Sequence, residues 1–281
     1  MALFKTNRFK NVKAMIGVWP ITVWEYEPGG QQERSIKKLI GDTEDDTTRT
    51  NCFQPDDPVG KRRYEMTVSI FSPTVAAVAL NLYAPKNGGV CFDPFAGGGT
   101  RMCMACAHDM DYVGIELREE ECKALNAKAK RLEIEDHVTI IQGDACDKHP
   151  EIESDSADFL LTCPPYYDLE KYNGGEGDLS MLPSYKEFIQ KLYPCVEETY
   201  RILKKGAISV WVVGLLRDSK GRLLFMNHDV ICIHEECGFF VKEEVIVYPK
   251  TGGALTRSNM FLKGNHNLVR VHQYALVFQK K

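Results

Sequence analysis

The sequence predicts an α/β fold with a mainly parallel, doubly wound sheet, in which helices cover both faces. Two observations favour it: strands and helices alternate regularly from about residue 67 onward, and several expected strands end in turns rich in glycine or proline. In such sheets, ligands bind at the rim formed by the carboxyl ends of the strands. Functional residues are therefore expected at those ends.

Seven strands and five helices account for this pattern. The expected strands cover residues 90–93, 112–117, 137–142, 158–162, 207–213, 241–248 and 271–278. The expected helices cover residues 73–83, 101–108, 119–132, 184–204 and 223–237. Pro73 stands at the first position of its helix, and Ser184 and Glu187 have the spacing of a capping box. The last two strands lack room for a crossover helix, so we expect them to pair antiparallel.

The amino-acid composition limits the classes of protein to which this chain could belong. The chain has 281 residues, 44% apolar and 26% charged, with a net charge of −4, which is ordinary for a globular protein with a large core. No apolar run approaches the roughly 20 residues of a membrane span, and no signal peptide is evident, so we expect a cytoplasmic protein with no membrane partner. Ten cysteines include one tight pair, Cys103 and Cys106, without a second pair to complete a zinc site. We expect no metal.

Residues 93–100, Asp-Pro-Phe-Ala-Gly-Gly-Gly-Thr, connect an expected strand to an expected helix. Glycines in such a turn let backbone N–H groups approach a ligand closely at the helix N-terminus. The turn has neither the register of a dinucleotide-binding motif nor the G-K-[ST] of a P-loop. It fits a ligand with an amino-acid end near the helix and a nucleoside end farther along the rim.

Acidic residues follow the next two strands. Glu116 is placed to accept hydrogen bonds from ribose hydroxyls, and Asp144 to accept one from an adenine amino group. Each alone could be a surface or helix-capping carboxylate. Three rim motifs on three successive strands favour a single ligand site.

The apolar run 157–161 ends at Thr162-Cys163-Pro164-Pro165-Tyr166-Tyr167. The two prolines fix φ and remove two backbone donors, so the chain stays extended and its carbonyls remain available. Free carbonyls beside an aromatic ring suit a planar heterocycle that bears an amine. A proline-terminated strand with core tyrosines explains this stretch alone equally well, and only the neighbouring motifs favour a site.

Together these motifs resemble the class I S-adenosylmethionine-dependent methyltransferases, and more narrowly the DNA amino-methyltransferases that act on adenine N6 or cytosine N4. Residues 93–100 match the family's first motif, D-P-F-x-G-x-G-T, and residues 163–166 match its catalytic motif, [D/N/S]-P-P-[Y/F/W], at three of four positions. Residues 68–73 are similar to the segment that covers the cofactor, and residues 270–278 to the closing strand. The chain also resembles the DNA methylases of phage and prophage genomes.

This resemblance implies a seven-stranded, Rossmann-like catalytic domain at residues 66–281, with S-adenosylmethionine as cofactor and DNA as partner, in a prokaryotic or phage-infected cell. The N-terminal extension, residues 1–65, would contact DNA or cover the cofactor. The implied cofactor-binding residues are Phe71, Asp93, Pro94, Phe95, Gly97, Gly99, Thr100, Glu116 and Asp144. The implied catalytic residues are Cys163, Pro164, Pro165 and Tyr166.

The expected reaction is methyl transfer to an exocyclic amine, a poor nucleophile because its lone pair is delocalised into the ring. Hydrogen bonds to the Pro164 carbonyl and to the side chain of residue 163 would free that lone pair for in-line attack. Tyr166 would stack on a base flipped out of the duplex. Cys163 departs from the family's Asn, Asp or Ser, and a thiol is a weak acceptor. The Pro164 carbonyl would therefore carry more of this work.

The C-terminal segment suggests the nucleic-acid contact. Residues 245–281 contain no Asp or Glu but six Lys or Arg residues. We expect residues 249–270 to form a target-recognition loop, although a solvated basic loop explains the pattern too. The expected DNA-binding residues are Tyr167, Lys171, Arg257, Lys263 and Arg270.

Other functions stay open at this point, and one is disfavoured. An RNA or protein-glutamine N-methyltransferase would use the same x-P-P-Y motif, and a catalytically silent nucleic-acid-binding protein could keep the fold. A nucleophilic Cys163, as in C5-cytosine methyltransferases, is disfavoured because their cysteine follows the proline instead of preceding it. The target base, the recognition sequence and the oligomeric state are not predicted.

Overall fold

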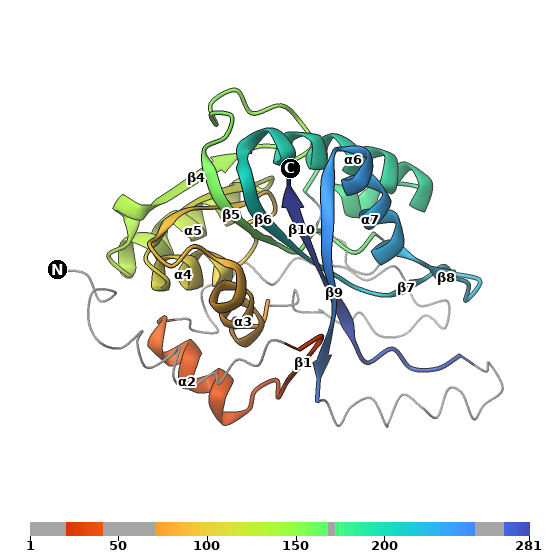
Figure 1. Ribbon diagram of the computed structural model, residues 1–281, viewed down its shortest axis with the longest axis horizontal. Coiled ribbons are helices and arrows are strands. Elements are labelled where there is room, and N and C mark those ends of the chain that lie inside the picture. The colour runs from red at the N-terminus through yellow and green to blue at the C-terminus, as the bar shows by residue number, and fades with distance from the viewer. Residues whose placement is uncertain (1–20, 42–70, 168–171, 173, 251–266) are drawn as a thin grey trace.

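The computed structural model describes residues 21–41, 71–167, 172, 174–250 and 267–281. At its centre lies an eight-stranded sheet in the order β1-β9-β10-β6-β5-β2-β3-β4 (Figure 1). The strands are β1 (Val23–Tyr26), β2 (Gly89–Asp93), β3 (Met110–Glu116), β4 (Val138–Gln142), β5 (Ala157–Thr162), β6 (Leu203–Val213), β9 (Phe239–Pro249) and β10 (Gln273–Lys280).

Seven of these strands are the predicted ones. Strands β2 to β6 pair in parallel, and β10 lies antiparallel between β6 and β9. The prediction of a doubly wound sheet closed by an antiparallel strand is confirmed. The eighth strand, β1, was not predicted, because four residues are too short for a periodic signal; it pairs in parallel with β9.

Helices cover both faces of the sheet (Figure 1). One face carries α3 (Pro73–Tyr83), α4 (Thr100–Ala107) and α5 (Glu119–Arg131), and the other carries α6 (Tyr185–Ile202) and α7 (Met226–Glu236). Side chains alternate along each strand, so that Cys91 belongs to the first core and Phe92 to the second. Because both faces are buried, the strands read as nearly continuous apolar runs.

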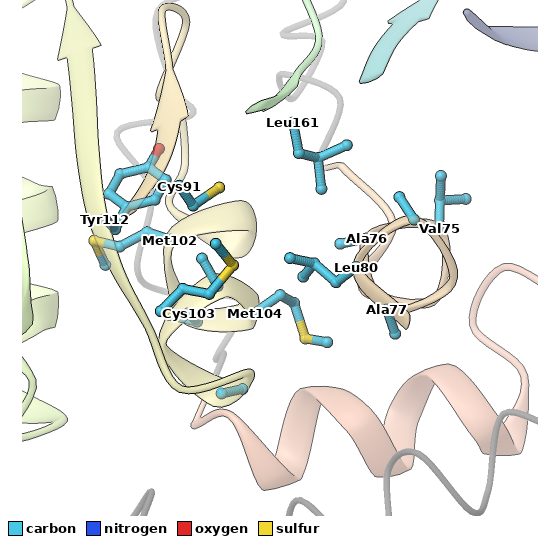
Figure 2. Packing of buried hydrophobic residues seen from close by; sticks show 14 of the residues in the cluster. Val75, Ala76, Ala77, Leu80, Cys91, Met102, Cys103, Met104, Tyr112 and Leu161 are labelled. Atoms are coloured by element: carbon cyan, nitrogen blue, oxygen red, sulfur yellow. The ribbon is translucent and has the colours of Figure 1, made fainter. Parts of the chain in front are cut away.

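Small side chains let α3 and α4 pack closely in the first core. Ala76 and Leu80 of α3 lie opposite Met104 and Cys103 of α4, and Leu161 of β5 lies above them (Figure 2). All are at most 2% exposed. Fully burying one leucine contributes about 1.5–3 kcal/mol, so this layer fixes α4 firmly beneath the glycine turn that precedes it.

The N-terminal segment packs onto the same core. Helix α2 (Gln31–Leu39) lies against α3, and Ile36 and Ile40 are fully buried. Trp24 of β1 is 5% exposed and its ring lies 6.5 Å from that of Tyr83. The predicted domain boundary at residue 65 lies outside the described residues, but residues 21–41 share the sheet and core of the predicted catalytic domain.

Helix starts follow the sequence signals, with one exception. Ser184 caps α6 by accepting a hydrogen bond from the Glu187 backbone N–H at 3.2 Å. Helix α7 begins three residues later than expected, because β8 (Leu223–Leu224) pairs with β7 (Leu216–Arg217) in a short hairpin. Two 3-10 turns, η3 (Glu135–His137) and η4 (Leu179–Met181), complete the described elements. No helix in the described part of the chain is both long and apolar enough to cross a membrane.

Candidate active site

A pocket lies where the strand order reverses, between β2 and its neighbours β3 and β5. This is where ligands bind in open α/β sheets. We give names to two groups of its lining residues. The glycine wall is residues 94–101, 115–118 and 143–145, and the proline wall is Tyr26, Ser72, residues 163–166 and Gln273.

The glycine turn is shaped by backbone conformation. Gly97 and Gly99 have φ values of +52° and +77°, which side chains on L-residues rarely allow. A Cβ on Gly99 would lie 2.7 Å from Leu125 Cδ2 of α5. The turn is tied to β3, since the Gly97 N–H donates to Glu116 Oε2 at 3.0 Å and the Ala96 N–H donates to the Ile115 carbonyl at 2.9 Å. The turn is therefore pre-organised.

Asp93 lies beneath the pocket and does not line it. It is fully buried and accepts four hydrogen bonds. These come from the Phe95 N–H at 3.1 Å, Thr162 Oγ1 at 2.7 Å, Arg101 Nε at 2.7 Å and Tyr112 OH at 2.8 Å. Through these hydrogen bonds Asp93 joins the ends of β2 and β5 and fixes the glycine turn; its role in cofactor binding stays a prediction.

Arg101 is a pocket residue that sequence reasoning missed. Its guanidinium also donates to the carbonyls of Phe95 and Ala96, and it lies 4.8 Å from the centre of the Phe71 ring. Phe71 itself lines the pocket, as predicted. The sequence did contain a feature that could have indicated this role: Arg101 is the one charged residue of helix α4. A buried arginine in such a helix requires a buried carboxylate as its partner.

Glu116 ends β3 in the pocket. Its Oε1 accepts a hydrogen bond from the Arg118 N–H at 2.9 Å, and its side chain is 11% exposed. Burial raises the pKa of Glu116 above its ordinary value, although the N–H groups of Arg118 and Gly97 and the Arg118 charge act against this. Because the Glu116 carboxylate is buried, it would accept a strong hydrogen bond from a polar ligand that displaces water.

Asp144 follows β4 and also lines the pocket. Its Oδ1 accepts from the Cys146 N–H at 2.9 Å, and its Oδ2 lies 2.8 Å from Lys191 Nζ of α6. Lys191 was not predicted, because nothing in the sequence shows that α6 passes this rim. The ion pair holds the carboxylate at the end of the glycine wall.

The proline wall begins where β5 ends. Cys163 Sγ lies 3.1 Å from the hydroxyl of Tyr166, so the thiol and phenol share a hydrogen bond. The Tyr166 ring packs on Gly214, where a Cβ would approach within 2.8 Å. Pro164 is buried, and residues 163–166 all line the pocket. The four predicted catalytic residues therefore face the same cavity as the glycine turn and Glu116.

The predicted DNA-binding residues are only partly described. Lys171, Arg257 and Lys263, and residues 251–266 of the predicted recognition loop, lie outside the described residues. Tyr167, with φ +43°, packs its ring against Tyr185 and Phe188 of the second core, at 5.7 and 5.8 Å between ring centres. Tyr167 therefore supports the chain next to the proline wall and does not line the pocket.

Arg270 lies beside the β7–β8 hairpin. The charge of Arg217 in that hairpin adds to burial in lowering the pKa of Arg270. Arg217 Nη1 donates to the Gly221 carbonyl at 2.7 Å, which fixes its guanidinium across the hairpin turn. Within the described part of the chain, neither arginine forms an ion pair with a carboxylate. Two guanidinium groups whose charges repel each other favour a nearby anion.

The described residues offer no cluster of three or more His, Cys, Asp or Glu side chains that could hold a metal ion. The nine described cysteines are all free thiols, and six of them are buried. Most behave as small apolar residues.

Residues 157–281 match a family model described as DNA methylase. The match starts at the first residue of β5, so it includes the catalytic motif, β10 and the hairpin, and excludes the glycine turn. No curated protein matches the sequence.

Solved structures share the fold at low sequence identity. A geranyl diphosphate methyltransferase in complex with GPP and sinefungin is 17% identical, with a TM-score of 0.54 over 75% of this chain and 79% of that one. The [4+2]-cyclase SpnF is 12% identical, with a TM-score of 0.54 over 88% and 92%. TrmN from Thermus thermophilus is 16% identical, with a TM-score of 0.49 over 75% of this chain and 49% of that one, so the present chain spans about half its length.

The class I methyltransferase fold is therefore confirmed. A cyclase with this fold shows that architecture alone does not set the reaction. The fold and the match of residues 157–281 to a DNA methylase model are the two comparisons on which the function proposed below rests.

Proposed function

We propose that this protein transfers a methyl group from S-adenosylmethionine to an exocyclic amine of DNA, adenine N6 or cytosine N4. The observation that carries the proposal is the meeting of two motifs in one pocket: Cys163-Pro164-Pro165-Tyr166 lines the same pocket as the glycine turn and Glu116. The family match to the DNA methylases favours DNA as the substrate.

The glycine wall fits the cofactor. Gly97 and Gly99 leave room for close approach to the turn, and Glu116 offers a carboxylate suited to ribose hydroxyls. Asp144, held by Lys191, stands at the end where an adenine amino group would lie. When bound, S-adenosylmethionine supplies a methyl group made electrophilic by its sulfonium. Phe71 and Arg101 close this wall beside helix α3.

The proline wall fits the acceptor. The Pro164 carbonyl accepts a hydrogen bond from the target amine, which draws the nitrogen toward tetrahedral geometry and frees its lone pair. Tyr166, wedged against Gly214, stacks on the base and faces the cation that develops on the nitrogen. Positioning accounts for most of the acceleration, and the mechanism needs no covalent intermediate.

The guanidinium groups of Arg217 and Arg270 support a nucleic acid over a small molecule. Arg270 comes shortly before β10 in the chain, and the first residue of β10, Gln273, lines the pocket. A phosphodiester between them would relieve their mutual repulsion and position the nucleotide whose base enters the pocket.

The test is methyl transfer from labelled S-adenosylmethionine to unmethylated duplex DNA, followed by nucleoside analysis. Parallel reactions contain RNA and a protein extract. We expect labelled N6-methyladenine or N4-methylcytosine. Label in RNA or protein alone would replace DNA with that substrate, and cofactor binding without transfer to any of them would favour a catalytically silent protein.

A further inference from the structure

A short segment that precedes α6 packs against the residues that follow β3 and β4. Four residues within 174–179 line the pocket, and we call them the strap: Gly174, Gly177, Asp178 and Leu179. In the sequence they stand close to the catalytic motif at residues 163–166. Two of them nevertheless pack against Leu117, which follows β3, and Asp144, which follows β4. The strap therefore lies against the glycine wall, although the chain connects it to the proline wall.

Asp178 fixes the shape of the strap. Its side chain accepts hydrogen bonds from the Gly174 N–H at 2.9 Å, the Ser180 N–H at 2.8 Å and the Ser180 hydroxyl at 2.7 Å. Asp178 is 6% exposed, and Leu179 is buried in the second core. Hydrogen bonds to a buried carboxylate are stronger than those between neutral groups. These bonds therefore stabilise the strap in the conformation that reaches the pocket.

Gly177 packs on the carboxylate of Asp144. Its φ is +90°, and a Cβ at this position would lie 2.7 Å from Asp144 Oδ2. The same oxygen pairs with Lys191 Nζ of α6 at 2.8 Å. A Cβ on Gly174 would likewise lie 2.8 Å from Leu117 Cδ2. The absence of side chains at these two positions lets the strap backbone approach both residues of the glycine wall.

A neighbouring glycine shows that this closeness is particular to the strap. Gly175 also has a positive φ, +79°, but a Cβ there would meet no atom within 4 Å. Gly175 is exposed and does not line the pocket. Backbone conformation alone explains glycine at residue 175, whereas at residue 177 the space beside Asp144 excludes a side chain as well. Substitutions at these two positions therefore separate backbone strain from contact with the pocket.

We propose that the strap is a further part of the cofactor site and covers the adenine end of S-adenosylmethionine. Gly177 is a positioning residue that acts through Asp144, because its backbone and Lys191 together fix the carboxylate that accepts from the adenine amino group. Asp178 is a positioning residue that acts through the strap backbone. The inference rests on the proposed function, since that function assigns Asp144 to the adenine. It brings a segment outside the recognised motifs into the cofactor site.

The test compares equilibrium binding of S-adenosylmethionine to wild type, Gly177→Ala and Gly175→Ala, without nucleic acid. Both substitutions place a methyl group at a positive φ, but only Gly177→Ala meets Asp144. We expect the Kd to rise about tenfold in Gly177→Ala, the loss of roughly one hydrogen bond to a charged group. In Gly175→Ala, the matched control, the Kd stays within about twofold. Urea denaturation of all three proteins measures the backbone strain that the two variants share.

Adenosine, which lacks the amino-acid end, serves as a second probe and locates the effect. Gly177→Ala should weaken the binding of adenosine and of S-adenosylmethionine by the same factor. Asp178→Asn removes one acceptor from the strap without adding an atom beside Asp144, and it should weaken both ligands too.

Three results would each overturn the inference while the proposed function stands: an unchanged Kd in Gly177→Ala, an equal loss in Gly175→Ala, or wild-type adenosine affinity in both strap variants. A wild-type protein that binds no S-adenosylmethionine overturns the inference and the proposed function together. If wild type binds the cofactor, the strap variants lose affinity as expected and no DNA is methylated, the proposed substrate fails and the assignment of the strap stands.

Discussion

The two walls of the pocket are built in opposite ways. The glycine wall comes from consecutive strand ends and is held by hydrogen bonds within the chain, with Asp93 accepting four and Glu116 tied to the turn by Gly97. The proline wall is assembled from Tyr26, Ser72, residues 163–166 and Gln273, which are far apart in the sequence. The first wall is held by contacts between neighbouring strand ends, whereas the second includes Cys163 and depends on contacts between distant segments.

This difference suggests that the two walls have different tasks, one binding the cofactor and the other selecting the acceptor. Binding a cofactor common to many enzymes requires a saturated, pre-organised surface. Selecting an acceptor requires groups whose lone pairs and ring faces are left for the substrate. Substitutions in the glycine wall should therefore affect stability or cofactor affinity, and substitutions in the proline wall should affect turnover.

The largest expected effect is on stability, from Asp93→Ala. The change leaves the Arg101 guanidinium, 6% exposed, without its carboxylate, and removing one partner of a buried pair costs about 3–5 kcal/mol. Urea denaturation measures the free energy of unfolding. Asp111→Ala is the control, since Asp111 pairs with His137 on the surface, and it should cost less than about 1 kcal/mol. Equal losses in the two variants would mean that Asp93 does not organise the glycine wall.

Next in size is the effect of Tyr166→Ala on turnover. Losing the ring removes stacking and cation stabilisation, and we expect kcat to fall on the order of a hundredfold, or about 3 kcal/mol. Tyr166→Phe keeps the ring and loses only the hydroxyl bonded to Cys163, so its loss should stay below about tenfold. Steady-state methyl transfer to DNA measures both. If Tyr166→Phe were as impaired as Tyr166→Ala, the hydroxyl rather than the ring would carry the function.

A smaller effect is expected on cofactor affinity, from Glu116→Gln. We expect the Kd for S-adenosylmethionine to rise about tenfold, because a charged acceptor is replaced by a neutral one. Glu119→Gln is the control, since Glu119 is exposed and pairs only with Lys123. Calorimetric titration measures both constants, and a similar Kd in all three proteins would remove Glu116 from the cofactor site.

The raised pKa of Glu116 adds a pH dependence with a definite sign. Burial makes the native protein hold this proton to higher pH than the unfolded chain, so the group's contribution to stability declines as pH rises between the two pKa values. Cofactor binding needs the carboxylate, so affinity should fall as pH drops through the raised pKa. Kd measured against pH should show this acidic limb in wild type and not in Glu116→Gln.

The smallest effect should come from the guanidinium pair. Arg217→Gln and Arg270→Gln each remove one phosphate contact, which should raise the KM for DNA several-fold and lower the slope of log K against log salt by about one. Neither should alter cofactor affinity. Lys123→Gln, on the distant surface of α5, serves as the control in the same salt series. An unchanged salt slope in both arginine variants would place the DNA elsewhere.

The sequence alone was sufficient to predict the features that are formed by residues close together in the chain. The glycine turn, Glu116 and the proline motif are contiguous stretches whose chemistry can be read from their residues, and the alternation of strands and helices orders them around one rim. Asp93 shows the limit within a motif: its hydrogen bonds to Thr162, Tyr112 and Arg101 could not be predicted from the motif itself.

Contacts between distant segments could not be predicted. Tyr26 enters the pocket only because a four-residue strand pairs with β9, more than 200 residues along the chain, and Lys191 meets Asp144 only because α6 passes the end of β4. The paired guanidinium groups likewise depend on a two-residue hairpin strand that was expected to be helix. Each needs tertiary packing that no local pattern encodes.

The division between the walls is tested most directly by equilibrium binding of S-adenosylmethionine, without nucleic acid, to wild type, Tyr166→Ala and Glu116→Gln. If one wall binds the cofactor and the other the acceptor, Tyr166→Ala binds within about twofold of wild type although it scarcely turns over, and Glu116→Gln binds about tenfold more weakly. Weakened binding in Tyr166→Ala with normal binding in Glu116→Gln would contradict the assignment of the two walls.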